Sequence, residues 1–285
     1  MNMPTTPCKG STAVRATKRP RLSDGEPWQK FELFPTPPWA TRALPEVVLP
    51  ALGVSSWGVS SRLGTVLEPA AGLGHMSDVL IDYGDVIASD IHLYSQSGLS
   101  TVAHGVTRAD FLDHRVIFDR PDWIITNPPF GKAQEFLIRA LSLAKCGVAL
   151  LLRMQWLETE GRYSAIFCEH PPTLVAQFAE RVPMCEGGWD PKLSTATAYA
   201  WFVWSRDPAG LWRAPAQRFG VGSLDFFLIP PGQKKRLSKP ADRLLATRCV
   251  PGFVPPSILK KVGKAQATFL LTTSETSDVA GERGA

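Results

Sequence analysis

Four consecutive residues, Asn127, Pro128, Pro129 and Phe130, follow the apolar run 123–126 and are the residues best suited to chemistry. An exocyclic aromatic amine is a poor nucleophile because its lone pair is delocalised into the ring. The Asn127 oxygen and the Pro128 carbonyl can accept the amine hydrogens and aim the lone pair at a methyl donor. The prolines stiffen the turn, and Phe130 can stack on a base that has left its helix. The motif predicts methylation of a planar amino nitrogen such as adenine N6, with an ordinary strand-ending turn as the alternative.

A glycine-containing segment upstream offers a place for a nucleotide cofactor. Residues 65–76 predict a strand that ends at Glu68, a tight turn with Gly72 and Gly74, and the start of a helix. Glycines let the backbone approach a ligand closely, and a helix N-terminus offers free N–H groups. Asp90 ends the next predicted strand, where nucleotide-binding sheets hold ribose hydroxyls. A helix cap or a turn is the alternative role for Asp90.

In this order, the motifs resemble those of class I S-adenosylmethionine-dependent amino-methyltransferases, in particular the N6-adenine DNA methyltransferases with the gamma-type motif order. The chain looks most like the small stand-alone enzymes of phages and prophages, and the resemblance covers about residues 31–204. It implies S-adenosyl-L-methionine as the cofactor and residues 127–130 as the catalytic motif. The cofactor-binding residues that it implies are Thr36, Glu68, Gly72, Gly74, Asp90, Asp110 and Phe111.

The resemblance also assigns these residues to different parts of the cofactor. Thr36 belongs to a Thr-Pro motif expected near the methionine end, and Asp90 is expected at the ribose. Asp110 and Phe111 are expected around the adenine ring. Thr36 has an alternative role as a helix start, because Pro37 and an apolar run follow it.

The alternation of apolar runs predicts an α/β fold. Strands are expected at about 65–67, 86–89, 102–106, 123–126, 148–153, 173–179 and 198–204, with helices such as 133–144 between most of them. We therefore expect a Rossmann-like class I methyltransferase sheet, seven-stranded and mostly parallel, with helices on both faces. The resemblance implies that the last strand lies antiparallel beside the sixth. The loops after strands one, two and four should meet at the carboxyl edge, where ligands bind.

The chain divides by composition into four parts. Residues 1–27 are expected to be a disordered basic tail, 28–207 the methyltransferase domain, 208–250 a short extension with a basic cluster, and 251–285 a mobile tail. Contacts of the tail and the cluster with phosphates would add salt-dependent affinity, and a solvated surface is the alternative. The cluster consists of Lys234, Lys235, Arg236, Lys239 and Arg243.

Three further residues could contact a substrate. Trp189 and Lys192 lie in the loop 183–197, where they could supply a second stacking face and a phosphate contact. Trp156 follows the fifth predicted strand and could line the pocket. Core packing is the alternative for both tryptophans.

Composition limits the remaining possibilities. With 285 residues and 44% apolar content the chain can form one main domain, and a net charge of +5 with a pI near 9.0 suits a polyanionic partner. The five cysteines and five histidines show no metal-ligand spacing, so neither zinc nor a disulfide is expected. No secretion signal or membrane span is evident, which predicts a cytoplasmic protein without a membrane partner. No required protein partner is evident.

Together, these features and the resemblance predict an enzyme that methylates adenine N6 in DNA after base flipping. Relatives with similar motifs methylate RNA adenine or a glutamine side chain in protein, so these acceptors are alternatives. Cytosine N4 is a further alternative, and so is a non-catalytic protein that binds nucleic acid.

Overall fold

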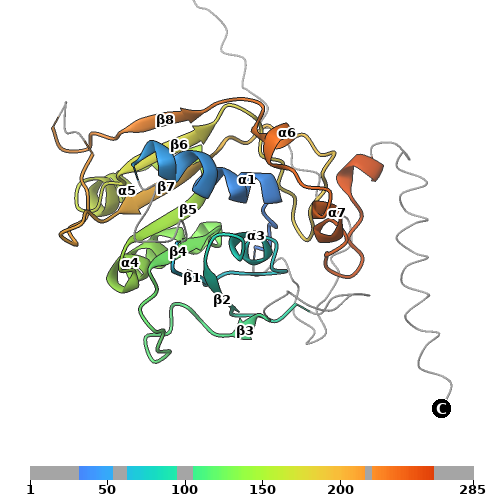
Figure 1. The fold of residues 1–285 in the computed structure, drawn as a ribbon, viewed down its shortest axis with the longest axis horizontal. Helices are drawn as coiled ribbons and strands as arrows, with labels where there is room; N and C mark the ends of the chain where they lie inside the picture. Colours follow the sequence, from blue (N-terminus) through green and yellow to red (C-terminus); the bar gives the residue numbers. More distant parts are fainter. Residues whose placement is uncertain (1–31, 54–62, 95–104, 216–219, 260–285) are drawn as a thin grey trace, which may run out of the picture.

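The computed structural model describes residues 32–53, 63–94, 105–215 and 220–259. Within them, an eight-stranded sheet has the order β3-β2-β1-β4-β5-β7-β6-β8 (Figure 1). The strands are β1 (Thr65–Glu68), β2 (Asp85–Asp90), β3 (Thr107–Arg108), β4 (Trp123–Thr126), β5 (Gly147–Arg153), β6 (Leu174–Phe178), β7 (Tyr199–Ser205) and β8 (Phe226–Ile229).

Most neighbouring strands are parallel, which confirms the predicted open Rossmann-like sheet. β1 pairs with β2 on one side and with β4 on the other, and β4 pairs with β5. As predicted, β7 lies antiparallel beside β6, and it pairs antiparallel with β5 as well. Because the strand order reverses between β1 and β4, the loops after these strands open a crevice at the carboxyl edge.

Two strands differ from the prediction. Of the strand expected at 102–106, residues 102–104 lie outside the described residues, and β3 begins only at Thr107. The strand β8 was not predicted; it pairs parallel with β6 at the edge of the sheet. Its apolar run has only four residues and is followed by Pro230 and Pro231, which weakens the sequence signal for a strand.

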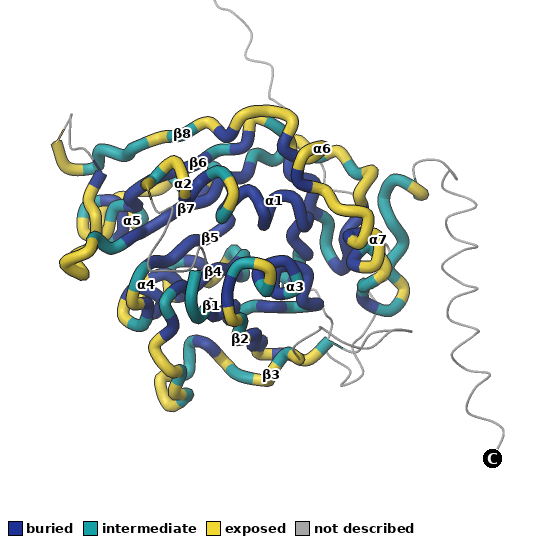
Figure 2. Tube along the Cα trace, viewed as in Figure 1, coloured by how far each residue is buried: buried dark blue, intermediate teal, exposed yellow. Residues whose placement is uncertain are grey.

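Helices cover both faces of the sheet, as predicted. On β4, Trp123 and Ile125 pack in a core that includes residues of α1 (Pro38–Ala43) and α3 (Ser77–Leu80). Ile124 points to the other face and packs in a core with α4 (Ala133–Leu143). Successive strand residues face opposite sides, so a strand covered on both sides is apolar at every position. Figure 2 shows the central strands as deeply buried.

The remaining helical segments are short; η marks a 3-10 or π-helical turn. They are η2 (Leu44–Val48), α2 (Leu49–Ala51), η3 (Phe130–Lys132), η4 (Met154–Leu157), α5 (Glu160–Arg162), η5 (Tyr163–Phe167), α6 (Gln233–Leu237) and α7 (Asp242–Leu245).

The helix α4 holds the turn that precedes it in place. Ala133, Phe136, Leu137 and Ala140 recur at the spacing of one helix face and are buried. The helix ends at Leu143 because the next residue adopts an extended conformation, with ψ 135°. Since α4 begins directly after η3, its packing fixes the position of residues 127–130.

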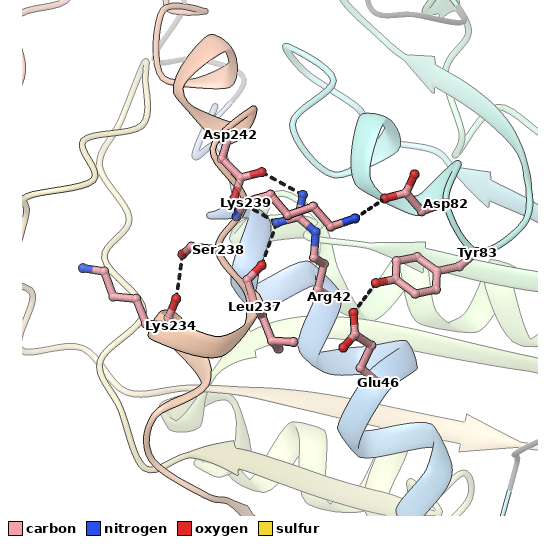
Figure 3. Close-up of polar contacts among 9 residues, drawn as sticks. All are labelled: Arg42, Glu46, Asp82, Tyr83, Lys234, Leu237, Ser238, Lys239 and Asp242. Atoms are coloured by element: carbon pink, nitrogen blue, oxygen red, sulfur yellow. Dashed lines mark hydrogen bonds and ion pairs between the residues drawn. The ribbon is translucent and has the colours of Figure 1, made fainter.

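Two described segments of the predicted extension 208–250 pack with the rest of the fold, since β8 pairs with β6 and α6 packs against α1. The buried Asp242 of α7 also forms an ion pair with Arg42 of α1 at 2.7 Å (Figure 3). Arg42 also donates to the carbonyl oxygen of Leu237 at 2.8 Å. These contacts tie the C-terminal helices to the first helix of the described chain.

The predicted basic cluster is partly engaged within the protein. Lys239 pairs with Asp82 at 2.8 Å, and Arg236 pairs with Glu46 at 3.5 Å. Lys235 is exposed. A phosphate-binding role of the cluster stays a prediction.

The predicted basic tail, residues 1–27, and residues 260–285 of the predicted C-terminal tail lie outside the described residues. Across the described ranges, no helix combines the length and the apolar character needed to cross a membrane.

Candidate active site

A cavity of about 280 Å³ lies at the carboxyl edge of the sheet. Its walls come from the loops after β1, β2 and β4, from residues 110–112 and from the segment 32–36 that precedes α1. The parallel strands explain why these loops meet. The predicted residues that line the cavity are Thr36, Glu68, Gly72, Asp90, Asp110, Phe111, Asn127 and Pro129.

The turn after β1 lets the backbone come close to the cavity. Gly72 and Gly74 have φ values of 54° and 77°, in the left-handed region that favours glycine. A Cβ atom on Gly72 would lie 2.6 Å from Cδ1 of Leu33, so this glycine also admits the segment 32–36. Gly74 shapes the turn without lining the cavity.

Asp90 is a buried acceptor at the end of β2. The N–H group of Gly72 donates to its Oδ2 at 2.8 Å, and the N–H group of His92 donates to its Oδ1 at 3.0 Å. Burial raises the pKa of Asp90 to about 6, and the backbone donors of His92, Gly72 and Ile91 oppose this shift. Each carboxylate oxygen has further acceptor capacity for a ligand hydroxyl. The contact with His92 also shows the turn role considered for this residue.

Glu68 is fully buried at the end of β1. The Ser77 hydroxyl donates to its Oε2. Burial raises the pKa of Glu68 to about 8; the Ser77 bond opposes the shift, and the nearby Asp90 charge adds to it. The carboxyl group is therefore mostly protonated at neutral pH and can donate a hydrogen bond as well as accept one.

Asn127 has one end of its side chain fixed and the other end free. Its Nδ2 donates to the Phe34 carbonyl at 3.0 Å and to the Thr36 hydroxyl at 3.2 Å. A carbonyl oxygen can only accept, so the amide nitrogen must face Phe34 and Oδ1 must face the other way. Oδ1 is buried and has no hydrogen-bond partner among the described residues.

The second predicted acceptor of the turn is the Pro128 carbonyl. Pro128 is buried and does not line the cavity, so a role of its carbonyl oxygen as the second acceptor stays a prediction. Pro129 adopts an extended conformation with φ −53° and ψ 127°, and its own carbonyl accepts from the Lys132 N–H group at 2.9 Å. Among the described residues, the turn thus presents one buried acceptor without a partner, Oδ1 of Asn127.

Thr36 does not cap a helix. The N-cap residue of α1 is Pro37, and no side chain caps this helix. The helix-start alternative for Thr36 is therefore wrong, because its hydroxyl accepts a bond from Asn127 instead. Thr36 is buried and lines the cavity, as a cofactor contact would.

Asp110 and Phe111 lie together at the cavity. Asp110 is exposed, and its Oδ1 accepts from the Leu112 N–H group at 2.9 Å. Phe111 is buried and packs against Phe136 with the ring centroids 5.0 Å apart. The pair offers an apolar face beside a polar group.

Phe130 is half-buried directly after the turn 127–129 but does not line the cavity. Its ring is tilted by 53° against Phe34, with the centroids 5.2 Å apart. The guanidinium carbon of Arg153 lies 3.9 Å from the Phe130 centroid. A stacking role of Phe130 stays a prediction.

The two tryptophans take the packing role that was their alternative. Trp189 is buried with Val79 and Leu245. Trp156 is buried with its ring against Phe202 at 5.4 Å. Neither lines the cavity, because both side chains are enclosed by apolar neighbours.

Lys192 is exposed in the loop 183–197, and its N–H group donates to Oδ1 of Asp190 at 3.0 Å. A contact of its ammonium group with a phosphate stays a prediction.

The sequence did not single out His75 or Arg153. His75 is buried and lines the cavity, and burial lowers its pKa to about 3, so the ring is neutral. Its position directly after Gly74 was the available signal. For Arg153 the sequence signal was weaker: it is a charged residue at the end of the apolar run 147–153. In the described part of the chain, no three His, Cys, Asp or Glu side chains are grouped as a metal site requires.

No protein-family profile and no curated protein matches this chain. Solved structures do resemble it. A candidate RNA methyltransferase from Pyrococcus horikoshii has 18% identity and a TM-score of 0.41, over 66% of this chain and 94% of that one. The methyltransferase subunit of a type I restriction-modification system from Streptococcus thermophilus has 12% identity and a TM-score of 0.41, over 59% and 43%.

A third similar structure is magnesium protoporphyrin IX methyltransferase from Synechocystis with bound S-adenosylmethionine. It has 14% identity and a TM-score of 0.35, over 59% of this chain and 80% of that one. The chain spans less than half the length of the Streptococcus thermophilus subunit. Likenesses at these values carry no argument about the substrate or the activity of this chain.

Proposed function

We propose that this protein binds S-adenosylmethionine in the cavity and methylates the N6 amine of adenine in DNA. The observation that carries the proposal is the fixed amide of Asn127. The Phe34 carbonyl holds its nitrogen at 3.0 Å, which leaves Oδ1 as a buried acceptor without a partner. An acceptor of this kind stabilises a donor whose positive charge develops during reaction, as an amine does when it attacks a methyl group.

The residues at the cavity fit the cofactor. The glycine turn admits a ligand beside the backbone, and Asp90 offers carboxylate oxygens for ribose hydroxyls. Phe111 provides an apolar face for the adenine ring. Thr36 and Glu68 would contact the remaining polar groups of S-adenosylmethionine.

The chain's part in the reaction is to orient and activate the acceptor. S-adenosylmethionine supplies an electrophilic methyl group on a sulfonium. The Oδ1 atom of Asn127 and the Pro128 carbonyl accept the two N–H hydrogens and direct the lone pair to the methyl carbon. Phe130 stacks on the flipped base, and Pro129 keeps the turn rigid. The nitrogen displaces the sulfur in line and then loses one proton to water, so no covalent enzyme intermediate is needed.

The substitution Asn127→Ala tests the proposal. We expect kcat to fall by about a hundredfold to a thousandfold or more, because the main acceptor for the developing charge is lost. The dissociation constant for S-adenosylmethionine, measured by calorimetry, should change by less than about threefold, since Asn127 acts on the acceptor. Full activity in this variant would contradict the mechanism, and absent cofactor binding in the wild type would favour a non-catalytic protein.

A further inference from the structure

The last residue of β5, Arg153, places a cation on the predicted stacking residue. Its guanidinium carbon lies 3.9 Å from the Phe130 centroid and 5.9 Å from the Phe34 centroid. A distance of 3.9 Å is too short for an approach from the ring edge, where hydrogen atoms intervene, so the guanidinium lies on a face of Phe130. Phe130 itself follows directly on the turn that begins at Asn127.

Packing alone does not explain a cation at this place. No carboxylate of the described residues lies within ion-pair distance of Arg153, and its Nε is buried without a partner. The residue opposite on β7 is Tyr199, whose hydroxyl forms a hydrogen bond with Arg153. Burial raises the pKa of this hydroxyl, the bond and the charge of Arg153 oppose the shift, and the neutral hydroxyl brings no negative charge. The attraction between the guanidinium and the face of Phe130 replaces only part of the hydration that the charge loses on partial burial. Among the described residues, the partly exposed Arg153 therefore has a neutral hydrogen-bond partner and an aromatic face but no anion beside it.

A phosphate group supplies the missing anion. A guanidinium is a planar fork of donors that binds phosphate oxygens in pairs. A nucleotide whose base is held at Asn127 carries a phosphate one sugar away, whereas a glutamine side chain of a protein brings no anion. We propose that Arg153 binds the phosphate of the nucleotide that is methylated. In moving to the phosphate, the guanidinium leaves the face of Phe130 free for the base.

This inference rests on the proposed function and narrows its acceptor to a nucleic acid. The experiment compares the wild type with Arg153→Gln, which removes the charge, and Arg153→Lys, which keeps the charge without the fork. Arg115→Gln is the control, because it removes a cation whose side chain is 91% exposed. For each protein, the KM for the nucleic-acid acceptor is measured at several salt concentrations, together with the Kd for S-adenosylmethionine.

We expect Arg153→Gln to raise the KM at least tenfold. The slope of log KM against log salt should become shallower by about one, which corresponds to one lost phosphate contact. Arg153→Lys should raise the KM at least threefold and retain the slope. The cofactor Kd should stay within twofold in both variants, and the control should match the wild type.

An unchanged KM and salt slope in Arg153→Gln, in an enzyme that methylates nucleic acid, would overturn the phosphate contact and leave the proposed function standing. If Arg153→Gln does not fold, an unchanged KM in Arg153→Lys would overturn it in the same way. Transfer by the wild type to protein alone would overturn this inference and the DNA proposal together.

Discussion

At the residue scale, the two ends of Asn127 have separate tasks. Its nitrogen joins the turn 127–129 to the segment 32–36, and its oxygen has no hydrogen-bond donor among the described residues. The motif singled out this residue in the sequence, and its role as an acceptor in the reaction stays a prediction. The sequence did not reveal the bonds to Phe34 and Thr36, because these partners lie more than ninety positions away, at separations of 93 and 91 residues. Contacts between distant segments depend on the fold.

Asp90 leads to a pH prediction. Burial raises its pKa from the ordinary 3.8 to about 6, so the cofactor-free protein holds the proton more tightly than an exposed carboxyl does. Ribose hydroxyls donate to the ionised form. We therefore expect the affinity for S-adenosylmethionine to be level above about pH 7 and to fall by up to about tenfold per pH unit below about pH 6. Calorimetry between pH 5 and 8 measures this.

The control for this pH dependence is Asp90→Asn, which should bind more weakly at every pH, without the decline below about pH 6. A decline of the same size in Asp90→Asn would assign it to another group, and a level wild-type profile would remove Asp90 from the ribose site.

At the scale of elements, the sequence predicted the strands and helices whose apolar residues follow a clear pattern. The central strands are apolar throughout because helices cover both faces, and α4 shows a clear buried stripe. The edge strand β3 has only two residues, and two prolines directly follow β8, which weakens the sequence signal for a strand there. Nor could the sequence decide whether Trp156 and Trp189 stack on a base or pack in the interior, because an aromatic side chain suits both roles.

The glycine turn gives a prediction with a matched control. Gly72→Ala and Gly210→Ala both place a side chain at positive φ, 54° and 82° respectively, which costs about 1–2 kcal/mol. At Gly72 the new Cβ also meets Leu33 at 2.6 Å, whereas nothing lies within 4 Å at Gly210. Gly72→Ala should therefore destabilise the protein more in urea unfolding and weaken cofactor binding. Gly210→Ala should leave cofactor binding unchanged. Equal effects of the two variants would contradict this account.

At the scale of the whole molecule, the two ends of the described chain hold each other. Arg42 and Asp242 form an ion pair in which the side chains are only 5% and 7% exposed. Residues 208–250 were predicted to be an extension because composition reveals their charge but not which strands or ion pairs they form with distant segments. The structure places β8 in the sheet and α6 against α1, and it joins α7 to α1 through the Arg42–Asp242 pair.

Removing one partner of this pair should destabilise the fold strongly. We expect Asp242→Ala to lower the free energy of unfolding by about 3–5 kcal/mol, because Arg42 keeps a buried charge without an anion. The double variant Arg42→Met with Asp242→Leu should recover much of this loss. Denaturant unfolding provides the measurement.

Asp82→Ala serves as the comparison, since it breaks a half-exposed pair with Lys239 and should cost less than about 1 kcal/mol. If Asp82→Ala and Asp242→Ala lowered the free energy of unfolding by similar amounts, burial of the Arg42–Asp242 pair would not explain its contribution to stability.

The most direct test of the central claim is methyl transfer with identification of the product. Wild type and Asn127→Ala are incubated with labelled S-adenosylmethionine and with unmethylated duplex DNA, single-stranded DNA or total RNA, and the modified nucleosides are identified by mass spectrometry. The account predicts N6-methyladenine in DNA with the wild type and its loss in the variant. Label in RNA alone would change the acceptor, and N6-methyladenine at the same rate in Asn127→Ala would contradict the account.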